Sequence, residues 1–125
     1  MTLGIGVVLV LVAGCTRSRD CTVVGYASSV GVSLPSSEWT LSEFCVDDDC
    51  LGRFQMGQRH AVLVDDDPDD HTYRLVAVDP EGVVVRRAGV VRTESYWVNG
   101  EGCEPRTANA TLVIGGDGRI TIRHP

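Results

Sequence analysis

The stretch WTLSEFCVDDDCLGRFQM, residues 39–56, decides the fold. Two runs of alternating apolar and polar residues flank the sequence VDDD, and a cysteine stands on each side of it. If Cys45 faces Cys50 across a hairpin, the large apolar residues of the two runs fall opposite one another. One face then carries the disulfide and the side chains of Trp39, Leu41, Phe54 and Met56.

The opposite face of this hairpin pairs polar residues with polar residues, and Phe44 and Leu51 near the tip are its exceptions. Alternation with a period of two residues is typical of a strand that buries one face and exposes the other. A shift of one residue would exchange the two faces. The pattern therefore predicts this register and a disulfide between Cys45 and Cys50.

The rest of the chain also has the pattern of strands. Short valine-rich segments lie at 59–64, 73–78, 83–86 and 90–93, and a predicted hairpin joins 111–114 to 119–123 through GGDG, with Ile120 and Ile122 alternating with polar residues. No segment has the apolar period of an amphipathic helix. These features predict an all-β fold, an antiparallel, immunoglobulin-like β-sandwich of seven to nine short strands with two disulfides. A small β-barrel is the alternative.

The first fourteen residues are typical of a secretion signal. The apolar run 3–12 is too short to cross a bilayer, and small residues precede Cys15 in the sequence VAGC. This resembles the lipobox of bacterial lipoproteins, in which the cysteine is acylated. The resemblance implies a signal peptide at 1–14, an acylated cysteine and linker at 15–20, and a single domain at 21–125 outside the cell membrane.

Export implies an oxidising compartment, where disulfides persist. With Cys15 acylated, an even number of cysteines remains. If Cys45 bonds Cys50, then Cys21 bonds Cys103 by elimination. The x₄ spacing of the hairpin cysteines differs from the C-x-x-C of zinc and redox sites.

Acidic residues gather in two segments of the chain. If 39–46, 51–56, 59–64 and 73–78 form an up-and-down meander, the hairpin tip and the loop 65–70 lie at one end. The aspartates that share this end are Asp47, Asp48, Asp49, Asp65, Asp66, Asp67, Asp69 and Asp70. Such oxygen ligands suit Ca²⁺, although the spacing departs from an EF-hand loop. We favour solvated turns and keep a Ca²⁺ site as the alternative.

Other residues give weaker signals. The chain of 125 residues has a net charge of −6, which is a poor match for the phosphate backbone of nucleic acids. It has no G-x-S-x-G, phosphate-loop or H-E-x-x-H motif. Tyr96 and Trp97 are candidates for a recognition surface, but aromatic residues beside a turn more often cover the core.

Four motifs together resemble small secreted lipoproteins of actinobacteria. They are the lipobox at Cys15, the Cys45-x₄-Cys50 hairpin, Asn99-Gly100-x-x-Cys103, and the closing segment Asp117-Gly118-Arg119-x-Thr-x-Arg123. The resemblance implies export and a lipid anchor, and it assigns no catalytic residue.

We therefore expect a lipid-anchored, non-enzymatic binding or structural module of the cell envelope, without a cofactor. Its partners would be the membrane, through the lipid, and an envelope protein or glycan. A Ca²⁺-dependent adhesive or carbohydrate-binding domain is the alternative. A small hydrolase comes third.

The two predicted disulfides should differ in their contribution to stability. Replacing Cys21 and Cys103 together by serine should lower the free energy of unfolding by about 4 to 5 kcal/mol, since that bridge closes a loop of roughly 83 residues. Replacing Cys45 and Cys50 together should cost about 2 kcal/mol. Denaturant titration measures both losses. Non-reduced peptide mapping that joins Cys21 to Cys45 or Cys50 would contradict the pairing.

Overall fold

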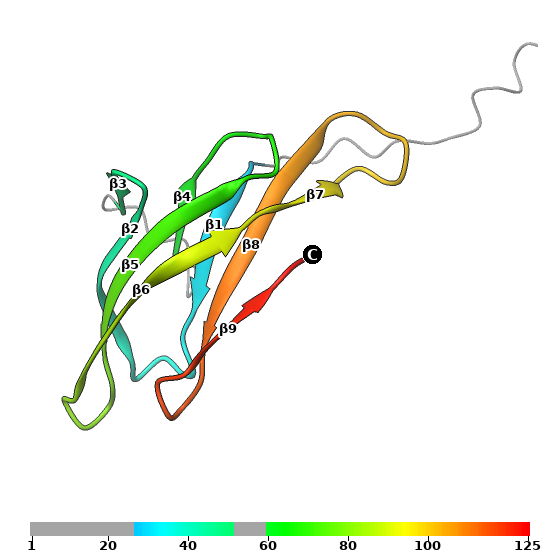
Figure 1. The fold of residues 1–125 in the computed structure, drawn as a ribbon. Helices are drawn as coiled ribbons and strands as arrows, with labels where there is room; N and C mark the ends of the chain where they lie inside the picture. Colours follow the sequence, from blue (N-terminus) through cyan, green and yellow to red (C-terminus); the bar gives the residue numbers. More distant parts are fainter. Residues whose placement is uncertain (1–26, 52–59) are drawn as a thin grey trace, which may run out of the picture.

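The chain folds into two facing β-sheets. The computed structural model describes residues 27–51 and 60–125. These residues form nine strands in two separate sheets, which lie side by side in Figure 1. The predicted all-β, immunoglobulin-like sandwich is confirmed in its two-sheet architecture. The barrel alternative is wrong, because the strands do not close into one continuous sheet.

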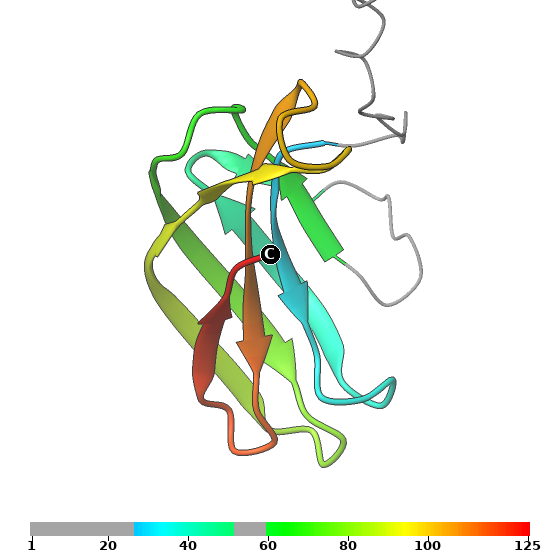
Figure 2. The same ribbon diagram turned by 90° about the vertical axis from the view of Figure 1, so that its right-hand side faces the viewer.

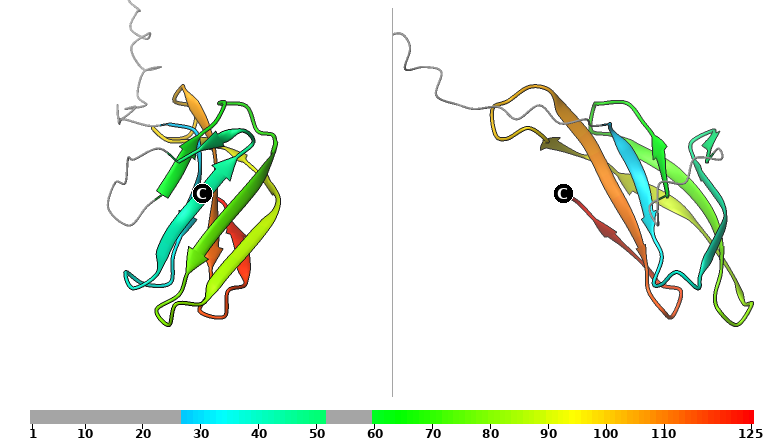
Figure 3. Two further views of the ribbon diagram at one scale, coloured as in Figure 1. Left: turned by 90° about the vertical axis from the view of Figure 1, so that its left-hand side faces the viewer. Right: turned by 180° about the vertical axis from the view of Figure 1, so that it is seen from behind.

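The first sheet, named the β5 sheet, contains the predicted hairpin. Its strand order is β3 (Asp49–Cys50), β2 (Thr40–Val46), β5 (Asp70–Val78) and β6 (Val84–Arg92). All its pairs are antiparallel. The left panel of Figure 3 shows this sheet in front.

The second sheet, named the β8 sheet, is organised around one long strand. It contains β4 (His60–Leu63), β1 (Ser29–Ser33), β8 (Arg106–Ile114), β7 (Glu94–Trp97) and β9 (Ile120–Arg123). One edge of β8 pairs with β1, and the other edge pairs with β7 along its first half and with β9 along its second. The β1–β8 pair is parallel, and it is the exception to the antiparallel arrangement of the described strands.

The core lies between the two sheets. Alternate residues of β8 and β1 face it from one side, and Phe44, Leu75, Ala77 and Val91 face it from the other. Burying large apolar side chains between the layers is what holds two sheets face to face.

A β-bulge in β2 corrects the predicted faces of the hairpin. The register shifts between Leu41 and Glu43, so Ser42 is an extra residue, and its hydroxyl donates to the carbonyl of Val76 at 3.1 Å. An extra residue reverses the alternation of the strand beyond it. Phe44 is therefore 1% exposed in the core. Its predicted place on the polar face is wrong.

The predicted pairing of Cys45 with Cys50 is confirmed. The two residues are register partners and form a disulfide. The bulge turns Cys45 to the face of the β5 sheet opposite Phe44, where it stays buried and its Sγ lies 3.4 Å from Arg74 Nη2. The predicted partners Phe54 and Met56 lie outside the described residues.

The predicted meander is wrong. Strand β5 pairs directly with β2, whereas β4 pairs with β1 in the other sheet. Strand β2 has seven residues, and β5 offers it a longer ladder of backbone hydrogen bonds than the four-residue β4 could. Strand β4 pairs instead with β1, which was not predicted.

The segments 83–86 and 90–93 belong to a single strand, not to the two that were predicted. Strand β6 pairs with β5 without interruption from Val84 to Arg92. Gly89 lies beneath the ring of Tyr73, whose hydroxyl would be 3.1 Å from an added Cβ. Gly89 therefore allows close packing within the strand and does not form a turn.

Thr93 marks the point where the chain changes sheets. Strand β6 ends before it in the β5 sheet, and β7 begins after it in the β8 sheet, as Figure 1 shows. The Thr93 amide donates to the carbonyl of Asp69 at 2.9 Å, and its hydroxyl accepts from the Asp69 amide at 3.1 Å. These bonds fix the corner of the sandwich.

The C-terminal hairpin is confirmed. Ile114 pairs with Ile120 across the turn, which is closed by Gly118 at a φ of 83°. Ile120 packs against the core, but Ile122 is 44% exposed, so the predicted alternation holds for only the first half of β9.

The assignment of faces predicts a contrast between two leucines. Leu75 is 0% exposed, and Leu63, on the outer face of β4, is 67% exposed. Leu75→Ala should lower the free energy of unfolding by about 2 to 5 kcal/mol, because it opens a cavity in the core. Leu63→Ala should change it by less than about 0.5 kcal/mol. Equal losses in denaturant titrations would contradict this arrangement.

Candidate functional site

The hairpin tip and the acidic loop lie at the same end of the sandwich. The Asp47 amide donates to the carbonyl of Thr72 at 2.7 Å, which brings the tip against the start of β5. A pocket of about 260 Å³ lies beside this contact, and Asp47, Asp49, Asp65 and His71 are among its lining residues. Three of the predicted aspartates thus come together, although the meander used to predict this is wrong.

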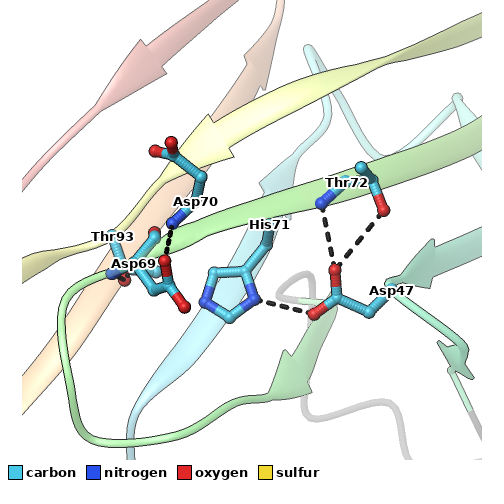
Figure 4. Close-up of polar contacts among 6 residues, drawn as sticks. All are labelled: Asp47, Asp69, Asp70, His71, Thr72 and Thr93. Atoms are coloured by element: carbon cyan, nitrogen blue, oxygen red, sulfur yellow. Dashed lines mark hydrogen bonds and ion pairs between the residues drawn. The ribbon is translucent and has the colours of Figure 1, made fainter.

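Asp47 joins the hairpin tip to β5 through its carboxylate, as Figure 4 shows. Its Oδ2 accepts a hydrogen bond from His71 Nδ1 at 2.8 Å, and its Oδ1 accepts from the Thr72 amide at 3.1 Å. Asp47 has a φ of 54°, in the left-handed region that aspartate tolerates better than most residues. The carboxylate thus holds a tight two-residue turn in place.

These hydrogen bonds also change the acidity of Asp47. The bond from His71 lowers the pKa of Asp47 below its ordinary value of 3.8, burial opposes this, and the bonds from Thr72 lower it further. Hydrogen bonds to the charged form of a carboxyl group favour that form.

His71 is a buried histidine with one free nitrogen. Its exposed fraction is 7%, and Nε2 has no hydrogen-bond partner among the described residues. The bond from Nδ1 to Asp47 fixes which nitrogen carries the proton in the neutral ring. An Asp–His pair of this kind activates a nucleophile only when a hydroxyl or thiol reaches Nε2. In the described part of the chain none does.

Three other aspartates of the loop take part in local structure, whereas the Asp67 side chain has no hydrogen bond or ion pair to another described residue. Asp66 accepts from the Ser28 hydroxyl at 2.6 Å, the Asp69 carboxylate accepts from the Asp70 amide at 2.8 Å, and Asp70 pairs with Arg92 at 3.1 Å. Within residues 27–51 and 60–125, no three His, Cys, Asp or Glu side chains are arranged to hold a metal ion. The Ca²⁺ site stays a prediction.

Tyr96 and Trp97 are successive residues of β7 and therefore project to opposite sides of the strand. Tyr96 is 43% exposed, and the Trp97 ring stacks on Arg106, whose guanidinium carbon lies 4.0 Å from the ring centroid. Neither residue belongs to the core cluster. Their role in recognition stays a prediction.

A second hollow lies on the outer face of the β8 sheet. Its volume is about 460 Å³, and its lining residues include Gly31, Ser33, Ala61, Thr111 and Arg123. Figure 2 looks onto this face, where the end of the chain lies in front of β8 and β1. Sequence reasoning missed this site, because β1 was not among the predicted strands.

The predicted sites at Cys15 and Cys21 lie outside the described residues. Cys103 is buried and disulfide-bonded, and its pairing with Cys21 stays a prediction. Among the described residues, no helix is long and apolar enough to span a membrane.

The fold and the two pockets define an all-β sandwich with one acidic end and one hollowed outer face. No protein-family model, curated protein or solved structure matches the chain.

The lowered pKa of Asp47 predicts a pH-dependent contribution to stability. Because the folded pKa lies below the ordinary value, the contribution is complete above pH 3.8 and is lost as the pH falls through the folded pKa. Asp47→Asn should therefore melt below the wild type at neutral pH, and the difference should shrink in acid. Thermal melts across this pH range measure it.

Asp48→Asn is the matched control for this prediction. The Asp48 side chain has no hydrogen bond or ion pair to another residue of the described chain. This variant should melt like the wild type at every pH. A destabilisation of Asp47→Asn that does not change with pH would contradict the role of the carboxylate charge.

Proposed function

We propose that this chain is a lipid-anchored binding module of the cell envelope, held at the membrane by acylation of Cys15. Small residues before Cys15 and the short apolar run upstream support the anchor. Acyl chains contribute about 0.8 kcal/mol per buried CH₂ group, so two or three chains would hold a folded domain at a membrane surface.

The observation that carries the binding role is the hollow on the outer face of the β8 sheet. Its volume of about 460 Å³ falls in the range of small-molecule sites. The hollow is formed by strands β1, β4, β8 and β9, which are joined by continuous backbone pairing. A site on paired strands is preformed, which reduces the entropy lost on binding.

A non-enzymatic role is favoured by the state of the Asp47–His71 pair. Both Asp47 carboxylate oxygens hold the hairpin on β5, and the His71 ring is buried at the junction. The pair therefore acts as a structural clamp in this proposal, and the ligand binds to the other sheet.

Metabolic labelling tests the anchor. Cells that express the full chain with a clickable palmitate should label the wild-type protein, and Cys15→Ser should lose the label, because serine lacks the acylated thiol. The wild type should also sediment with membranes, and the variant should not. Cys50→Ser, which breaks the bridge with the smaller predicted contribution to stability, controls for the loss of a cysteine and should keep the label. Equal labelling of the wild type and Cys15→Ser would overturn the proposal.

A further inference from the structure

The floor of the hollow is a row of small residues across three strands. Gly31 is the register partner of Ala61 on β4 and of Thr111 on β8, and Thr111 is in turn the partner of Arg123 on β9. Register partners project to the same face of a sheet. Three small residues, of which Gly31 has no side chain at all, are thus followed by one long cation, and this order produces a depression with a guanidinium at one end.

Three polar side chains of the hollow are uncommitted, whereas His124, which also lines it, is bonded to Glu94 and to the carbonyl of Arg92. The side chains of Arg123, Ser33 and Thr111 make no hydrogen bond or ion pair with other described residues. Arg74 pairs with Glu43 and Arg92 pairs with Asp70, whereas the side chains of Arg86 and Arg119, like that of Arg123, make no hydrogen bond or ion pair with other described residues. Arg123 is exposed at the edge of the hollow and has all its donors available.

The carboxylate of Glu94 is held by His124, which is a lining residue of the hollow. Glu94 Oε1 lies 3.7 Å from His124 Nδ1, and His124 Nε2 lies 2.7 Å from the carbonyl of Arg92. These contacts hold the residue that follows Arg123 at the junction of β9 and β7. The Arg123 backbone is therefore fixed on both sides, by β9 pairing and by His124.

We infer that this hollow binds a small anionic ligand, whose carboxylate or phosphate group is held by Arg123 and whose hydroxyl or amide groups meet Ser33 and Thr111. The inference rests on the proposed binding function and names its ligand class. A guanidinium binds a planar carboxylate or a phosphate through two parallel hydrogen bonds. The flat floor at Gly31 and Ala61 leaves room for a ring.

Titration calorimetry on the full chain in detergent tests the ligand class. The probes are glucuronate and glucose 6-phosphate, with glucose as the uncharged counterpart of both. At least one anionic probe should bind the wild type about tenfold more tightly than glucose, or about 1.4 kcal/mol. The stronger of the two distinguishes a carboxylate from a phosphate ligand. Arg123→Gln should remove this preference.

Two further variants separate the contribution of the Arg123 charge from that of the shape of the hollow. Arg119→Gln removes the same charge from the residue before β9, outside the hollow, and should bind like the wild type. Ala61→Leu fills the floor from an exposed position and should abolish binding without loss of folding, which thermal melts check.

The outcomes distinguish this inference from the proposed function. If glucose and the two anions bind equally well, and Arg123→Gln binds them like the wild type, the inference of an anionic ligand is wrong. The proposal that the chain is a binding module would still stand. Absence of binding by all three probes would overturn the inference. The palmitate label at Cys15 reports on the anchor separately, so a failure of the anchor does not affect the titration result.

Discussion

The extra residue at Ser42 determines on which side of β2 every later side chain lies. Without the bulge, Phe44 would face solvent and Cys45 would enter the core. With it, Phe44 and Val46 pack between the sheets, and Cys45 is buried on the opposite face of the strand, next to Arg74. The sandwich core and the outer face of the β5 sheet therefore both depend on one irregular backbone pair.

The sequence contains the signal for this bulge, although simple alternation does not reveal it. The core residues Leu41 and Phe44 are three positions apart, where an uninterrupted strand would place them two or four apart. The Cys45–Cys50 register and the C-terminal hairpin were predictable because each is local and closed by a short turn. The parallel β1–β8 pair joins residues about 80 positions apart, and no local pattern specifies it.

At the acidic end, too, the local sequence predicts only part of the candidate site. The composition of the loop predicts that carboxylates gather there, but it does not predict their partners. Asp47 bonds His71, and Asp70 bonds Arg92. These partnerships depend on the β2–β5 and β5–β6 ladders. Mutual repulsion among carboxylates is offset by histidine, arginine, hydroxyl and amide donors, so a dense acidic cluster in sequence becomes a set of separate structural contacts.

Three residues shape the hollow. Strand pairing explains why one of them is small, but it does not explain the identity of the other two. An added Cβ at Gly31 would lie 3.3 Å from the carbonyl of His60, so close pairing of β1 and β4 already favours glycine there. Ala61 is exposed, and packing does not require a small side chain at its position. Arg123 has no hydrogen bond or ion pair with other described residues and ends the row of Gly31, Ala61 and Thr111, in a chain with a net charge of −6. The case for a ligand therefore rests on Arg123 and Ala61, because fold stability alone accounts for neither.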